Sequence, residues 1–132
     1  MSARLAEFAP RMLSILRIMT ALIFLEHGTQ KLLGFPPGSQ MPMPAPFTLI
    51  WFSGVIEMVP GALLAIGLFS RTAAFLAAGE MAFAYFIGHA KDGFFPVNNH
   101  GDAAILYCFI FLYIAFAGAG PWSLDALWRK KE

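Results

Sequence analysis

The stretch SGVIEMVPGALLAIGLFSRTAAFLAAGE, residues 53–80, contains two apolar runs separated by a short polar break. The first run extends back to residue 47 and the second extends forward to residue 89, which predicts helices at 47–69 and 72–89. A helix needs about 20 mostly apolar residues to cross a hydrocarbon core ~30 Å thick. Because the connection FSRT is so short, we expect these two helices to form a tight antiparallel hairpin.

The composition favours a membrane protein. Of the 132 residues, 58% are hydrophobic and only 13% are charged. A small soluble domain has a large surface for its volume and needs polar side chains to cover it. The net charge of +1 gives no argument for nucleic-acid binding. The single cysteine, Cys108, excludes an intramolecular disulfide and a CxxC redox pair.

Two further apolar runs lie at residues 11–33 and 102–119, and the first is expected to be a retained helix rather than a cleaved signal peptide. The runs are joined by loops rich in Pro, Gly and polar residues, GFPPGSQMPMPAP at 34–46 and KDGFFPVNNHGD at 91–102. We therefore predict one domain, residues 1–132, with an all-α fold. It is an integral membrane four-helix bundle with a short C-terminal tail, SLDALWRKK, at the membrane interface.

The orientation follows from the positive charges near the helix ends. With four spanning helices, Lys31 and Lys91 fall on one side of the membrane. A larger basic set falls on the other side: Arg4, Arg11, Arg71, Arg129, Lys130 and Lys131. This asymmetry predicts that both termini are cytoplasmic.

Small residues recur at four-residue spacing in the third run, as Ala73/Ala77, Ala74/Ala78 and Ala78/Ala82. Small residues at this spacing let the backbones of two helices approach closely in lipid. The third helix is therefore expected to pack against a neighbouring helix through this alanine face.

One cluster of ionisable residues is predicted within the membrane. A charged group there costs roughly 2.5–3.5 kcal/mol on insertion scales and usually faces a partner in the bundle. Helix rise places Arg17 about 9 Å, Glu80 about 12 Å and Glu57 about 18 Å from the cytoplasmic helix ends. We expect Arg17 to bind one carboxylate bidentately and the other glutamate to be protonated. The cluster is either a polar staple that fixes helix order or a proton relay or ligand site.

A second cluster is predicted at the outer side of the bundle. Its members come from three helices and one loop: Glu26, His27, Lys31, His89, His100 and Asp102. They form either a pocket for a polar head group or a quinone carbonyl, with His and Glu exchanging protons, or a set of interfacial residues satisfied by water. The spacing matches neither HExxH nor ExxH, so no metal site is predicted.

Four stretches carry a resemblance to a known family: FLEHGTQKLLGF at 24–35, SGVIEMVPGALLAIGLFSRTAA at 53–74, AYFIGHA at 84–90 and GAGPWSLDA at 118–126. With these residues the chain resembles the DoxX family of small four-helix bacterial inner-membrane proteins. The family often carries NGGE before its last helix, where this chain has NNHGD, so Asp102 would replace a glutamate.

The resemblance implies a link to quinol oxidase or thiosulfate:quinone oxidoreductase subunits, and to membrane complexes that handle oxidative or thiol stress. It makes the matched ionisable residues candidate functional positions without giving any of them a catalytic role: Glu26, His27, Lys31, Glu57, Arg71, Glu80 and His89.

Three functions are then compatible with the sequence. The first is a quinone-interacting or oxidoreductase-associated membrane subunit, with quinone as the ligand. The second is a non-enzymatic structural subunit that packs against other subunits of a membrane complex or against further copies of this chain. The third is a small transporter or proton channel that uses Arg17, Glu57 and Glu80.

Overall fold

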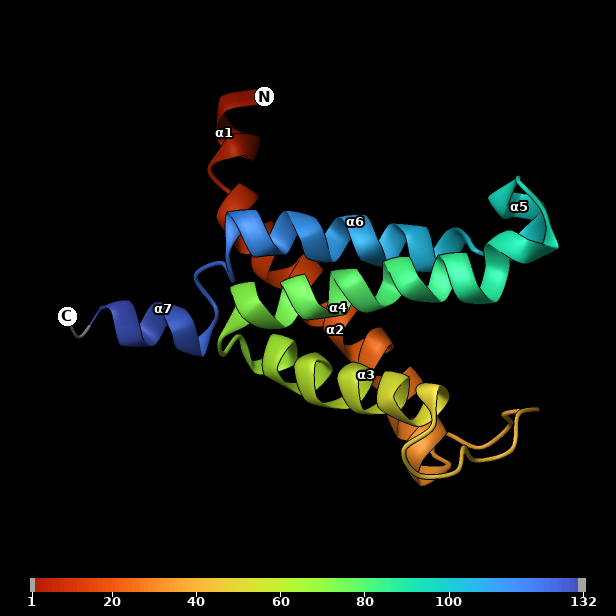
Figure 1. The fold of residues 1–132 in the computed structure, drawn as a ribbon. Helices are drawn as coiled ribbons and strands as arrows, with labels where there is room; N and C mark the ends of the chain where they lie inside the picture. The colour runs from red at the N-terminus through yellow and green to blue at the C-terminus, as the bar shows by residue number, and fades with distance from the viewer. Residues whose placement is uncertain (1, 131–132) are drawn as a thin grey trace.

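The protein is described by a computed structural model covering residues 2–130, and in this range it is helical without a strand (Figure 1). The four long helices are α2 (Ala9–Leu33), α3 (Leu49–Ile66), α4 (Ser70–Ala84) and α6 (Asp102–Ala117). Short helices are α1 (Ser2–Ala6), α5 (Pro96–Asn99) and α7 (Leu124–Arg129), and α4 continues through a π turn (Tyr85–His89) and a 3-10 turn (Ala90–Asp92). The predicted all-α class is confirmed.

The long helices form two pairs. Helix α2 packs most extensively on α3, helix α4 packs most extensively on α6, and α3 joins the pairs through its contact with α4. Both described ends of the chain lie at one end of the bundle, which we call the terminal end (Figure 1). The loop of residues 34–48 and helix α5 lie at the opposite end, which we call the loop end (Figure 1).

Local sequence explains where the helices stop. Helix α2 ends at Gly34, which has φ of 68°, and α3 ends at Gly67, which has φ of 73°. Glycine adopts this left-handed backbone conformation without a steric penalty. At the start of α3, the Thr48 hydroxyl accepts a hydrogen bond from the Trp51 amide at 3.3 Å. Only residues 67–69 separate α3 from α4, so the two helices form the expected short hairpin.

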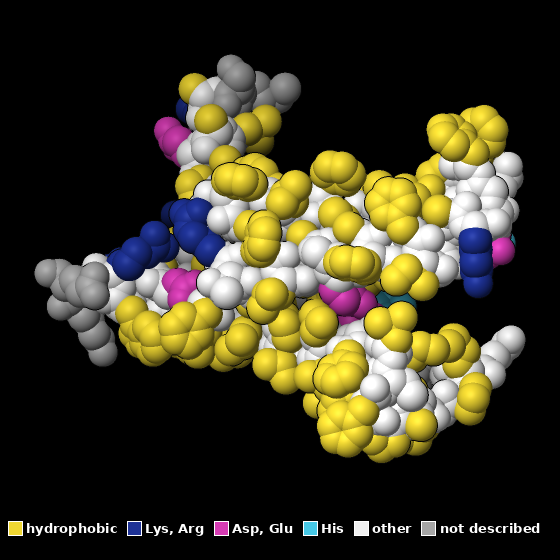
Figure 2. Space-filling model, viewed as in Figure 1, with side chains coloured by type: hydrophobic (Ala, Val, Ile, Leu, Met, Phe, Trp, Pro, Cys, Tyr) yellow, Lys and Arg dark blue, Asp and Glu magenta, His cyan; other side chains and the backbone are white. Residues whose placement is uncertain are grey.

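The bundle buries polar side chains and exposes apolar ones. Arg17, Glu57 and Asn99 are almost fully buried, whereas Phe83 and Phe116 are 70% and 78% exposed. Hydrophobic side chains cover most of the face shown in Figure 2. A soluble protein shows the reverse distribution, and this one suits a helical protein that is surrounded by lipid.

Two of the described helical segments are long and apolar enough to cross a membrane, Leu49–Ile66 and Ser70–Asp92. Helix α6 is apolar but shorter, with 16 residues. Helix α2 has 25 residues and carries several charged side chains. That α2 and α6 also cross the membrane stays a prediction.

The core between α4 and α6 contains the alanine face that the sequence predicts. Ala73, Ala74, Ala77 and Ala78 are at most 3% exposed and belong to the same buried cluster as Phe111. These short side chains let α4 approach α6 closely, as expected for helices that associate in lipid.

The chain after α6 is tied back to the bundle at the terminal end. The two Asp125 carboxylate oxygens accept the backbone amides of Phe69 and Ser70 at 2.8 and 2.9 Å. The Ser123 hydroxyl caps α7 by accepting the Ala126 amide at 3.1 Å. The predicted tail is therefore a short anchored helix as far as it is described, and Lys131 lies outside the described residues.

Candidate functional site

A buried polar network lies near the loop end of the bundle. Lys31 of α2 donates hydrogen bonds to Glu57 Oε1 of α3 at 2.7 Å and to Ser53 Oγ at 2.8 Å. Ser53 in turn donates to Glu80 Oε1 of α4 at 2.8 Å. The resulting chain from Glu57 through Lys31 and Ser53 to Glu80 connects three helices, and we call these four residues the Lys31 network.

Lys31 reaches Glu57 because α2 and α3 touch through glycine at this level. A Cβ atom on Gly28 would lie 2.6 Å from the Met58 backbone nitrogen and 2.9 Å from the Glu57 carbonyl carbon. On the facing helix, a Cβ atom on Gly54 would lie 3.0 Å from the side chain of Leu32. Any larger residue at position 28 would push the helices apart, so Gly28 is required for the short ion pair.

The Lys31 network contains unsatisfied acceptors. The Glu57 side chain is only 4% exposed, and its Oε2 is buried without a hydrogen-bond partner among the described residues. Glu80 Oε2 is in the same situation. Buried polar atoms are almost always hydrogen-bonded, so two such atoms in one network mark a place where a proton, a water or a ligand group belongs.

The charge balance of the network also indicates a bound proton. One lysine faces two carboxyl groups, and a second negative charge in a low-dielectric interior is costly. The network is electrically neutral when a single proton is bound by one of the two glutamates. Figure 2 shows acidic side chains, with a histidine beside them, at the seam between the two helix pairs.

A small pocket of about 140 Å³ adjoins the network, and Lys31 belongs to both. Polar side chains of α2 form one wall, with His27, Gln30 and Lys31. The other wall consists of the proline-rich loop and the start of α3: Ser39, Met41, Pro42, Met43, Pro44 and Ile50. A molecule in this pocket would meet polar donors on one side and apolar side chains on the other.

The predicted cluster of Arg17 with Glu57 and Glu80 is wrong. Arg17 is fully buried, but its guanidinium donates to backbone carbonyls: Ala119 at 2.8 Å, Ala65 at 3.0 Å, and also Leu64 and Trp122. Glu57 lies beside Gly28, which is eleven residues beyond Arg17 and therefore about 16 Å further along α2. Lys31 takes the role that was predicted for Arg17.

The preference of Arg17 for carbonyls has a simple cause. The last carbonyls of α3 have no amide donor within the helix, and the irregular segment after α6 also presents free carbonyls. A guanidinium offers several donors in a planar fork and can satisfy several of these oxygens together. Arg17 therefore connects α2 to the end of α3 and to the segment after α6 at the terminal end of the bundle.

The predicted outer cluster is only partly assembled. His27 and Lys31 line the same pocket, and the His27 ring lies edge-on to Tyr107 with centroids 6.2 Å apart. Glu26 is exposed on α2 and does not line the pocket. The ammonium group of Lys31 turns inward to Glu57 and does not extend toward the membrane interface.

The remaining outer residues lie around α5 instead. His89 Nδ1 is 3.0 Å from the Asn99 carbonyl oxygen, while His100 is exposed in a left-handed conformation and Asp102 is exposed at the start of α6. Within residues 2–130, no group of three or more His, Cys, Asp or Glu side chains could hold a metal ion.

Two residues that form important side-chain hydrogen bonds were not predicted from the sequence. Ser53 lies four residues before Glu57 and so shares its helix face, a signal that was available. Asn99 is 2% exposed, donates to Tyr85 Oη at 3.2 Å and to the Gly93 carbonyl at 2.9 Å, and accepts the Gly101 amide at 2.8 Å. Asn99 organises the loop before α6, and nothing in its sequence context distinguishes it from Asn98.

Comparison with known proteins places this site in a family. The chain is 45% identical to an uncharacterized protein of Haemophilus influenzae, in an alignment that covers 96% of this chain and 98% of the relative. It is 27% identical to an uncharacterized membrane protein of Mycobacterium tuberculosis, over 96% of this chain and 86% of the relative. No solved structure matches. The sequence model of the DoxX family matches residues 12–90, a segment that contains all four residues of the Lys31 network, and the chain therefore belongs to the DoxX family of membrane proteins.

Proposed function

We propose that this DoxX family protein is an oxidoreductase-associated subunit of the bacterial inner membrane that binds the head group of a quinone. The observation that carries the proposal is the double role of Lys31, which lines the pocket and also bonds to the buried carboxyl group of Glu57. A ligand in the pocket would thus be in hydrogen-bond contact with a group that can exchange protons with two glutamates.

The chemistry of quinones suits this arrangement. Reducing a quinone to a quinol consumes two electrons and two protons, and both protons are added to the carbonyl oxygens of the ring. His27, Gln30 and Lys31 offer hydrogen-bond donors to such oxygens, and Glu57 and Glu80 offer proton-binding sites behind them. In this proposal of an oxidoreductase-associated subunit, the electrons would come from a partner subunit.

The size and lining of the pocket suit the ring of a lipid-soluble quinone. Its volume of about 140 Å³ admits a single ring rather than an isoprenoid tail. The methionine and proline side chains of the loop supply an apolar wall, and methionine adapts well to a flat ring. The tail would remain in lipid along the exposed apolar surface of the bundle.

The proposed orientation has both termini in the cytoplasm, which places the pocket on the opposite side of the inner membrane. The quinone would then be met near the outer surface of that membrane.

The test is a titration of the purified protein, in mild detergent, with a short-tailed ubiquinone analogue. We expect saturable binding that weakens about tenfold in His27→Ala, as for the loss of one hydrogen bond worth roughly 1.4 kcal/mol. His100→Ala is the matched control, since His100 is exposed and outside the pocket, and its affinity should not change. No saturable binding, or equal losses in the two variants, would refute the proposal.

A second candidate is a structural subunit without a ligand. The observation in its favour is that the Lys31 network joins three helices, as a polar staple would. Gentle native extraction distinguishes the two. A structural subunit should leave the membrane bound to partner proteins and without quinone, whereas the first proposal requires quinone among the bound molecules.

A further inference from the structure

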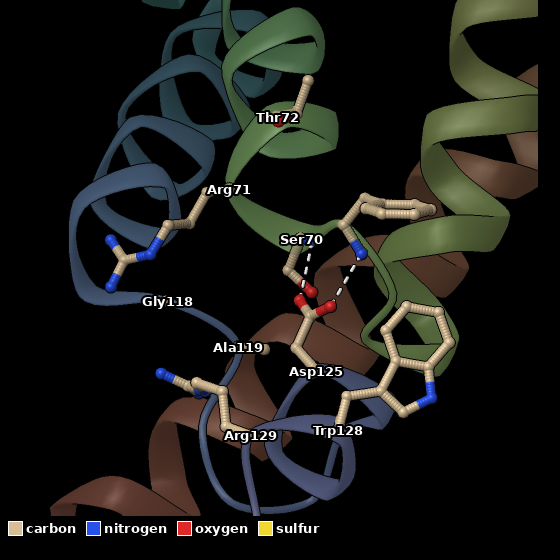
Figure 3. A pocket seen from close by; sticks show the side chains of 9 residues that line it. Ser70, Arg71, Thr72, Gly118, Ala119, Asp125, Trp128 and Arg129 are labelled. Atoms are coloured by element: carbon tan, nitrogen blue, oxygen red, sulfur yellow. Dashed lines mark hydrogen bonds between the residues drawn. The ribbon is translucent and has the colours of Figure 1, made fainter. Parts of the chain in front are cut away.

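A pocket with a volume of about 340 Å³ lies at the terminal end, far from the Lys31 network. The start of α4, the end of α6 and helix α7 surround it. Figure 3 shows Arg71 and Arg129 on one side of this pocket, flanking the segment Gly118–Ala119, and Trp128 on the opposite side. We call it the arginine pocket.

Both arginines have hydrogen-bonding capacity left. Within residues 2–130, the hydrogen bonds of Arg71 all use Nη1, which donates to the Ala115 and Phe116 carbonyls. These bonds fix the guanidinium beside Gly118, which has φ of 92° and leaves room for it. Arg129 is exposed and forms neither a side-chain hydrogen bond nor an ion pair with any described residue. The pocket therefore has two cationic donors, one of them held in position.

The carboxylate in the pocket does not cancel these charges. Asp125 uses one oxygen for the Phe69 amide and the other for the Ser70 amide, at the start of α4. The positive end of the α4 dipole compensates a carboxylate in this position. Asp125 thus serves the helix end and leaves the two guanidinium groups available to an anion.

The surroundings of the arginine pocket suit a lipid. Trp128 is half exposed and packs against Phe69 with ring centroids 5.9 Å apart, and Leu127 beside it is also half exposed. Tryptophan next to basic residues at a helix end is typical of the membrane interface. Phe75, which is 65% exposed, follows Arg71 by one helical turn and adds an apolar surface on the same face of α4.

We propose that the arginine pocket binds the phosphate group of an anionic phospholipid, with Arg71 and Arg129 as its two ligands. Arginine forms paired, charge-assisted hydrogen bonds with phosphate oxygens. The acyl chains then lie along the apolar faces of α4 and α6, and the head group lies between α7 and the bundle.

The test is lipid binding to the full chain in detergent micelles, measured by native mass spectrometry with phosphatidylglycerol and phosphatidylcholine. We expect phosphatidylglycerol to bind more tightly, and Arg129→Gln to weaken it about tenfold through the loss of a charge-assisted contact. Arg11→Gln is the matched control, because Arg11 is exposed outside the pocket, and it should change the affinity less than about twofold. Equal losses in the two variants, or equal affinities for the two lipids, would overturn the proposal.

A second arm separates lipid from free phosphate. Inorganic phosphate is added to the protein at millimolar concentration, and the shift in the thermal unfolding midpoint is compared with the shift caused by phosphatidylglycerol. The lipid should raise the midpoint in the wild type and not in Arg129→Gln. If inorganic phosphate gives the same Arg129-dependent shift, the pocket serves a soluble phosphate and the assignment to lipid is wrong.

Discussion

The two ends of the bundle both bury cationic side chains between helices, and they satisfy them in different ways. At the terminal end, Arg17 is fully buried and bonds only to backbone carbonyls. At the loop end, Lys31 is 28% exposed and bonds to side chains, among them a carboxyl group with an unsatisfied oxygen. In the first arrangement every guanidinium nitrogen already has a carbonyl partner, whereas the second contains carboxyl oxygens without one.

This difference distinguishes a charged side chain that stabilises the fold from one that can take part in proton exchange. A guanidinium that fills the carbonyl positions of a helix end stabilises one conformation and has no proton to exchange. An amine linked to two carboxyl groups can change its hydrogen bonds and its proton distribution without unfolding the bundle. Arg17 is therefore expected to contribute stability, and the Lys31 network activity.

The largest effect is expected from Arg17→Met. The substitution introduces an apolar side chain of similar length and leaves four backbone carbonyls without their donor. We expect the free energy of unfolding in detergent to fall by about 3–5 kcal/mol, the range for breaking a buried charged interaction. Denaturant titration followed by circular dichroism measures the change. Arg11→Met, at an exposed site, should change it by less than about 0.5 kcal/mol. A stable Arg17→Met protein would remove the basis of the comparison.

The next effect is expected from Gly28→Ala. The new Cβ would meet the α3 backbone at 2.6 Å, so α2 and α3 must separate and Lys31 must move away from Glu57. We expect a loss of about 1–3 kcal/mol in the free energy of unfolding and a weaker quinone affinity in the same protein. Gly79→Ala is the control, because no atom lies within 4 Å of a Cβ there, and it should stabilise α4 by about 0.5–1 kcal/mol. If the two variants behaved alike, the helices would not depend on this close contact.

A smaller effect is expected from the ion pair itself. A double-mutant cycle with Lys31→Met and Glu57→Gln isolates the coupling between the two side chains. We expect a coupling energy of about 1–2 kcal/mol, above that of an exposed pair and below that of a fully buried one, because Lys31 is partly exposed. Glu80→Gln should change stability little, since its Oε1 can still accept from Ser53. A coupling energy near zero would show that the pair is maintained for another reason.

Helix positions were predictable because their signals are local. Apolar runs and the proline-rich loop indicate the helices, and the alanine face of α4 follows from simple spacing. The end of the first long helix was predicted correctly at residue 33, but the second was extended to residue 69, past Gly67, where α3 ends. The partners of Arg17 and Lys31 were not predictable in this way. They depend on the register between α2 and α3, which is set by the contact of Gly28 with the backbone of Met58.

The candidate site was likewise predicted only in part from the sequence. The sequence identified His27, Lys31, Glu57 and Glu80 as unusual, because ionisable groups in apolar helices are costly. It grouped Lys31 with His27 in the outer cluster and expected Arg17 to meet the two glutamates. In the structure the Lys31 side chain turns inward to Ser53 and Glu57, and the proline-rich loop lines the same pocket.

The smallest effect is expected at the terminal end, from Asp125→Asn. The asparagine keeps one oxygen that can accept a backbone amide but loses the second acceptor and the negative charge at the start of α4. We expect a loss of about 1 kcal/mol in the free energy of unfolding, typical of a helix cap. Asp92→Asn, at an exposed site near the loop end, should have no measurable effect. Because Asp125 lies in the arginine pocket, its neutralisation should also tighten the binding of phosphatidylglycerol slightly. A weaker affinity would mean that Asp125 positions α7 for the lipid, and the two functions of this end would then be coupled.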